Sequence, residues 1–200
     1  MRRFLRKLAI VSLFFAAGVI LLLALATDSI PLVDRSEAIS PTAVAQAKRL
    51  LAINDPRQQK AGEMRTIVIP ASLLDEGINY LAGRYLRGRG AVLLQNDAAQ
   101  IVVTIQLLTH RFLNLRAIVQ PLDGKPRIAS AYLGNLPLPS ALLEFAVARG
   151  IMAYGFTKEW ELANQSLKEV SFIPEQNVAS VTYIWEPSIL DHARAAAMSA

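Results

Sequence analysis

The sequence predicts an α+β fold: an N-terminal transmembrane helix, then one extracytoplasmic domain in which an antiparallel β-meander is packed by helices. Three observations predict it. An uncharged apolar run follows a basic N-terminus, apolar and polar residues alternate across 91–133, and helical spacing occurs on both sides of that stretch. The chain has 200 residues, 53% of them hydrophobic, and no cysteine. It is therefore long enough for one core, and disulfide scaffolds and cysteine-ligated metal sites are excluded.

The first element is the apolar run. Residues 8–27 carry no charge, and as a helix they would span roughly 30 Å, the thickness of a bilayer core. The basic residues precede the run, so residues 1–7 are predicted to be a cytoplasmic tail and the rest to lie outside a bacterial cytoplasmic membrane, on its periplasmic side. An uncleaved anchor is favoured. The alternative is a signal peptide cut after Ala26, because Ala24-Leu25-Ala26 fits a small-x-small cleavage pattern.

The charge balance argues against nucleic acid as a partner. The net charge is +5, but four of the 21 basic side chains lie in the predicted tail. The remaining 17 are almost balanced by 16 acidic side chains. The exported part is thus nearly neutral and has no overall basic surface for a phosphate backbone.

Residues 28–40 contain Pro31, lack helical periodicity and are predicted to be a stalk, and residues 41–200 are predicted to form the domain. Its first helix runs from the cap Ser40-Pro41 to about Ile53, with an apolar stripe at 44, 47 and 51. A short strand at 66–69 follows. Ser72 and Asp75 resemble a capping box for a helix that reaches about Gly83, with Leu74, Ile78 and Leu81 on one face.

The meander is predicted at 91–95, 100–108, 112–120 and 127–133. Asn96-Asp97 and Asp123-Gly124 are typical hairpin turns, and connections this short require antiparallel neighbours. Ile101 and Val103 share one face of the second strand. On the third strand Leu113, Leu115, Ala117 and Val119 share a face, with Asn114, Arg116 and Gln120 opposite.

The C-terminal part is predicted to contain helices at 140–154 and 157–167, a hairpin of 170–173 with 178–185, and a last helix capped by Ser188 and Asp191. The helix at 140–154 is apolar around most of its circumference. This pattern is typical of a central core helix. The alternative is that one side lines an apolar groove for a lipid, a membrane or a partner helix, and the candidate groove residues are Leu142, Phe145, Ile151, Met152 and Tyr154.

Three arginines form a second candidate site. Arg84, Arg87 and Arg89 lie between Gly83 and Gly90, in a predicted loop close to the membrane. There they are predicted to contact lipid phosphates or an acidic partner, at about 1 kcal/mol per cation near an anionic surface. A solvated loop is the alternative interpretation.

No catalytic, cofactor-binding or metal-binding residues are predicted. His110 and His192 are the only histidines and are too far apart in sequence for a zinc motif. No carboxylate pair, phosphate-binding loop or serine elbow is present. The sequence therefore predicts a protein that is not an enzyme.

Short motifs give a resemblance. The basic tail and single span precede SLLDEGINY, then FLNL, DGKPR and LGNLPLPS in order. Over about residues 64–150 this arrangement resembles small membrane-anchored extracytoplasmic proteins of unknown function of the YpmS type. The resemblance implies a shared architecture and supplies no catalytic residues.

The predicted function is a membrane-anchored envelope protein whose domain binds or scaffolds, in contact with membrane lipids or another envelope protein. The alternative is a carrier domain for a lipid or another hydrophobic ligand, and an envelope hydrolase ranks third. A filled space between the 140–154 helix and the sheet would favour scaffolding. An open apolar cavity of several hundred Å³, roughly the size of a ligand pocket, would favour a carrier.

Overall fold

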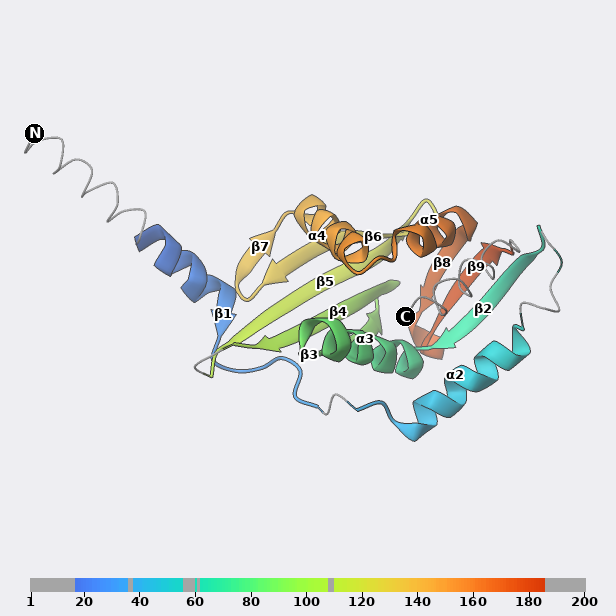
Figure 1. The fold of residues 1–200 in the computed structure, drawn as a ribbon, viewed down its shortest axis with the longest axis horizontal. Helices are drawn as coiled ribbons and strands as arrows, with labels where there is room; N and C mark the ends of the chain where they lie inside the picture. The colour runs from blue at the N-terminus through green and yellow to red at the C-terminus, as the bar shows by residue number, and fades with distance from the viewer. Residues whose placement is uncertain (1–16, 36–37, 56–59, 61, 108–109, 186–200) are drawn as a thin grey trace, which may run out of the picture.

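A computed structural model describes residues 17–35, 38–55, 60, 62–107 and 110–185. Its main sheet is antiparallel, with the strand order β3-β4-β5-β6-β7 (Figure 1). These strands are β3 (Gly88–Gln95), β4 (Ala98–Gln106), β5 (Phe112–Leu122), β6 (Lys125–Leu133) and β7 (Leu136–Leu138). The predicted α+β class and antiparallel meander are confirmed, and β7 is an additional short strand.

Two local turns set the order of the meander. Asn96 and Asp97 have φ of 48° and 55°, and Asp123 and Gly124 have φ of 51° and 75°. Positive φ at both central residues defines the hairpin turn whose twist matches that of the flanking strands. The pairing places Val103 opposite Leu115 and Thr104 opposite Asn114. The predicted faces of β4 and β5 are therefore confirmed.

A second sheet was not predicted. It has the order β2-β9-β8, from β2 (Met64–Pro70), β8 (Leu167–Ile173) and β9 (Val178–Ile184). The predicted hairpin of β8 and β9 is present, and β2 adds to it with Met64 opposite Ile184. The buried core lies where this sheet meets the main sheet and the start of α3; it comprises Ala71, Leu94, Ala99, Val170, Phe172 and Ala179.

Four helices complete the described domain: α2 (Pro41–Ile53), α3 (Ala71–Leu86), α4 (Ser140–Ala153) and α5 (Thr157–Ser166). The side chain of Ser40 caps α2 by accepting a hydrogen bond from Ala43 N, as predicted. The predicted stripe is wrong, however, because Leu51 is 68% exposed and Ala43 is the buried residue. The predicted C-terminal helix at Ser188 lies outside the described residues.

The start of α3 differs from the prediction. The residue before the helix is Pro70, with no side-chain cap, so Ser72 and Asp75 do not form a capping box. Asp75 instead accepts a hydrogen bond from Val92 N of β3 at 2.7 Å and forms an ion pair with Arg35. The Asp75 carboxylate therefore binds groups that are distant in sequence and does not cap the start of the helix.

The predicted transmembrane helix falls partly outside the described residues, since these begin at Ala17. Residues 17–26 are helical and almost entirely exposed. Among the helices that the structure describes, none combines the length and the apolar character needed to cross a membrane. Directly after this helical segment, β1 (Thr27–Asp28) pairs with the start of β5.

The first part of the predicted stalk, residues 28–33, lies against the main sheet, and the chain then continues toward α2 (Figure 1). Leu32 N donates to Asn114 Oδ1 at 3.2 Å, and Val33 N donates to Thr104 Oγ1 at 3.1 Å. Val33 is only 5% exposed. Residues 28–33 are therefore part of the packed domain rather than a free stalk, because backbone amides in this segment are satisfied by polar side chains of the sheet.

Candidate functional site: an apolar groove between α3 and α4

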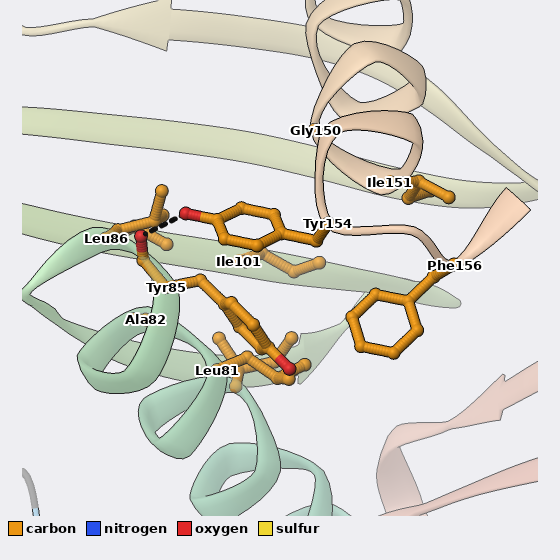
Figure 2. A pocket seen from close by; sticks show the side chains of 11 residues that line it. Leu81, Ala82, Tyr85, Leu86, Ile101, Gly150, Ile151, Tyr154 and Phe156 are labelled. Atoms are coloured by element: carbon orange, nitrogen blue, oxygen red, sulfur yellow. Dashed lines mark hydrogen bonds between the residues drawn. The ribbon is translucent and has the colours of Figure 1, made fainter. Parts of the chain in front are cut away.

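An apolar groove of about 430 Å³ lies over the main sheet, between α3 and the C-terminal end of α4 (Figure 2). Ile101 and Val103 of β4 form its floor. One wall comes from residues 78–86 of α3, and the other comes from α4 and the link to α5. The wall residues are Ile78, Leu81, Ala82, Tyr85, Leu86, Gly150, Ile151, Tyr154 and Phe156.

The α3 wall follows from helical spacing. Ile78, Leu81, Ala82 and Tyr85 recur at intervals of three and four, which places them on one face of the helix. Ala82 is only 2% exposed, and its small side chain lets the helix lie close to the sheet. The prediction that this helix ends at about Gly83 misses Tyr85 and Leu86, although their spacing continues the same face.

Polar side chains of α3 fix the helix against β3. This strand is an edge of the sheet, so the N–H groups on its free side need partners. Asn79 is fully buried, and its Oδ1 accepts a hydrogen bond from Gly90 N at 3.0 Å. With the Asp75–Val92 bond one turn earlier, two strand amides are satisfied by one helix. The wall of the groove therefore has a fixed position relative to its floor.

Aromatic rings join the two walls at one point. The rings of Tyr85 and Tyr154 meet edge to face with centroids 4.7 Å apart, and Tyr85 and Phe156 do so at 6.2 Å. The Tyr154 hydroxyl donates to the carbonyl oxygen of Tyr85 at 3.0 Å (Figure 2). Such pairs contribute about 0.5–1.5 kcal/mol beyond the area that they bury. They hold α4 and α3 together beside the groove without filling it.

The lining determines what the groove accepts. The lining side chains are aliphatic or aromatic, and their only polar groups are the hydroxyls of Tyr85 and Tyr154, of which that of Tyr154 donates to the Tyr85 carbonyl oxygen. A phosphate, carboxylate or sugar inside the groove would lose its hydration and would find at most the Tyr85 hydroxyl as a side-chain partner, at a cost of several kcal/mol. The groove therefore suits hydrocarbon, with any polar group of the ligand outside.

Only some of the predicted groove residues line the groove in the structure. Ile151 and Tyr154 line the groove. Leu142, Phe145 and Met152 do not; they are exposed by 53%, 57% and 56%. The prediction of a central core helix is wrong, because α4 has no buried residue and only one side of it faces the sheet. Sequence periodicity could not reveal this, since both sides of α4 are apolar.

The three arginines do not share one loop. Arg84 lies in the last turn of α3, Arg87 follows the helix with φ of 51°, and Arg89 belongs to β3. Arg89 forms an ion pair with Asp34 at 2.9 Å and so helps to hold the segment before α2. Arg84 and Arg87 are exposed, and neither has an ion-pair partner within the described ranges. Of the three, these two remain available to a ligand or a surface.

The described residues contain no group of three or more His, Asp and Glu side chains able to hold a metal ion. His110 is exposed in the turn before β5 and has φ of 56°, and His192 lies outside the described residues. No protein-family model, curated protein or solved structure matches the chain. The resemblance to the YpmS type therefore remains a prediction.

Proposed function

We propose that the domain binds the long alkyl or acyl chain of a lipid or fatty acid in the groove between α3 and α4. The observation that carries this proposal is the open apolar space of about 430 Å³, which lies within the range of roughly 300–1,000 Å³ typical of ligand pockets. A scaffolding helix packed on the sheet would have left no such space. The hydrophobic-ligand alternative is therefore preferred over the scaffold.

The exposure of the lining gives a driving force for binding. Leu81 is 48% exposed, Leu86 46% and Tyr154 53%. Removing apolar surface from water is favourable by roughly 25 cal/mol per Å², for the protein and for the ligand. An alkyl chain bound along these side chains would remove apolar surface of both the protein and the ligand from water. Water in the groove, by contrast, finds few polar partners.

We further propose that the domain acts at the outer side of a bacterial cytoplasmic membrane, held by residues 8–26 as an uncleaved single-pass anchor, since Thr27 already belongs to β1. The apolar run and the basic residues before it support this location. Binding rather than catalysis is proposed, because no reactive side chain lines the groove.

A helical glycine offers a direct test. Gly150 lines the groove, and a Cβ placed there would meet no atom within 4 Å. Gly150→Phe should therefore fill the groove without strain, and stability should not fall, since glycine is the poorer helix former by about 0.5 kcal/mol. With the full chain kept in solution by an amphipathic polymer, palmitic acid carrying a diazirine should label the groove walls of the wild type. Gly150→Phe should reduce this labelling about tenfold.

The matched control is Gly77, in α3. It is also helical, and a Cβ placed on it would meet no atom within 4 Å, but it is exposed and does not line the groove. Gly77→Phe should label like the wild type. Equal labelling of both variants, or labels scattered over the surface, would contradict the proposal.

A further inference from the structure

The end of the main sheet beside the predicted anchor is defined by strand register. Gly88, Ile105, Leu113 and Thr27 are aligned across β3, β4, β5 and β1. With neighbouring strands about 4.8 Å apart, Gly88 lies about 15 Å from Thr27. The helical segment that ends at Ala26 is fixed there too, because Asn135 N donates to Leu25 O at 2.9 Å. The sheet thus begins where the apolar run ends.

An apolar row connects the groove with this end of the sheet. Ile101 and Val103 form the groove floor. Ile105 is the next residue on the same face of β4 and is half-buried, and Leu107, just past the strand, is 37% exposed. Leu86, at the end of α3, lines the groove and is 46% exposed. Hydrocarbon surface therefore continues from the groove toward the anchor.

Two exposed cations lie at the same end. Arg87 directly precedes Gly88 of the aligned row, and Arg84 is one helical turn before it. Neither has an ion-pair partner in the described part of the chain. Exposed basic side chains near an anionic membrane surface are attracted to its headgroups. Arg87 lies beside Thr104 and Gln106, on the face of β4 opposite the groove floor, so these cations would meet a lipid phosphate at the edge of the sheet, outside the groove.

We propose that the groove takes its acyl chain from a phospholipid of the membrane that holds the domain, entering from the anchor end of the sheet along Ile105 and Leu107. Arg84 and Arg87 contact the phosphate of that lipid and favour anionic headgroups. This inference rests on the proposed function of the groove and adds the source of the ligand and its route. A free fatty acid from solution is the other source of the same chain.

The test uses the full chain reconstituted in vesicles of phosphatidylcholine that contain phosphatidylglycerol with a diazirine near the end of one acyl chain. In the wild type, irradiation should label the groove walls. Leu107→Asn places a polar amide on the route at an exposed position and should lower this labelling about tenfold. Leu122 is 61% exposed at the opposite end of β5, so Leu122→Asn should label like the wild type.

Substitutions that remove positive charge test the preference for anionic headgroups. Arg84→Gln with Arg87→Gln should reduce phosphatidylglycerol labelling to the level found with a diazirine-bearing phosphatidylcholine. Lys125→Gln with Arg127→Gln removes the same charge from exposed positions at the far end of the sheet and should have no effect. Wild-type labelling in both double variants would exclude the arginine contact.

Two outcomes separate this inference from the proposed function. If palmitic acid labels the groove of the polymer-held chain but phospholipid does not label it in vesicles, the route is wrong and the groove remains a ligand site. If neither probe labels the groove, both proposals fail. Equal phospholipid labelling of Leu107→Asn and Leu122→Asn would overturn the route alone.

Discussion

At the scale of single residues, Asn114 shows how one amide organises a segment distant in sequence. Its Oδ1 accepts from Thr104 Oγ1 at 2.8 Å as well as from Leu32 N, and its Nδ2 donates to Ile30 O at 3.0 Å and Asp28 Oδ2 at 2.8 Å. The residue is 1% exposed. All hydrogen-bonding capacity of a buried amide is thus used, which favours a unique position for the chain around it.

Replacing Asn114 should therefore weaken the domain. Asn114→Leu leaves the buried Thr104 hydroxyl and the part-buried Leu32 N and Ile30 O without this partner, and a buried unsatisfied group costs about 1–3 kcal/mol. We expect the free energy of unfolding, measured by urea denaturation, to fall by about 3 kcal/mol. Protease cleavage within residues 28–35 should also become faster. Asn164 is exposed on α5, and Asn164→Leu should change neither quantity; equal losses in the two variants would contradict the assigned role.

The sequence predicted the orientation of Asn114 but not its burial. Alternation on β5 places the side chains of Leu113 and Leu115 on one face of the sheet and that of Asn114 on the other face, as found. A polar residue on that face is expected to meet water. It does not, because residues 30–33 cover it, and nothing in the local pattern of either segment predicts this contact.

At the scale of elements, local signals were sufficient for the meander and insufficient for the second sheet. The turns at Asn96-Asp97 and Asp123-Gly124 are set by neighbouring residues, so the pairing of β3 to β6 could be predicted. The partner of β2 is β9, more than 100 residues away. Such a pairing depends on the burial of both strands in one core, and no local residue pattern beside β2 or β9 indicates it.

The groove, too, could be predicted from local signals only in part. The α3 wall could be predicted in part, from the spacing of Ile78 and Leu81. On the opposite wall, Ile151 and Tyr154 could be predicted. They could not be separated from Leu142, Phe145 and Met152, because α4 is apolar around most of its circumference and its spacing does not indicate which side faces the sheet. That side becomes evident only from tertiary contacts, such as the contact of Tyr154 with Tyr85.

Close packing of α3 on β3 predicts a cost at Gly90. A Cβ there would lie 2.8 Å from both the Cγ2 and the carbonyl oxygen of Ile78. Gly90→Ala should push α3 from the strand and lower stability by about 1–3 kcal/mol, as overpacking does elsewhere. In Gly77→Ala, by contrast, the added methyl meets open space and stability should rise by about 0.5–1 kcal/mol. Thermal unfolding of both variants is the measurement; a harmless Gly90→Ala would mean that the helix has room to move.

At the scale of the whole molecule, the arrangement couples the predicted anchor to the groove without a spacer. Gly134 has φ of 58°, and a Cβ there would lie 2.6 Å from Leu25 O, so the turn after β6 fits closely around the end of the helical segment. β1 follows this segment directly and pairs with β5 of the main sheet. If the apolar run that ends at Ala26 spans a bilayer as proposed, the groove has a set position relative to the membrane surface.

This coupling predicts the effect of a spacer. A Gly/Ser linker of about ten residues between Ala26 and Thr27 extends roughly 17 Å as a random coil. It should cost the Leu25–Asn135 and Thr27–Leu23 hydrogen bonds, about 1 kcal/mol each, while β1 stays paired. Labelling of the groove by the phosphatidylglycerol probe should fall several-fold, since the route no longer meets the bilayer. The same linker between Lys7 and Leu8 leaves the distance from span to sheet unchanged and should label like the wild type. Undiminished labelling with the linker before Thr27 would show that close attachment of the domain is not what supplies the groove with lipid.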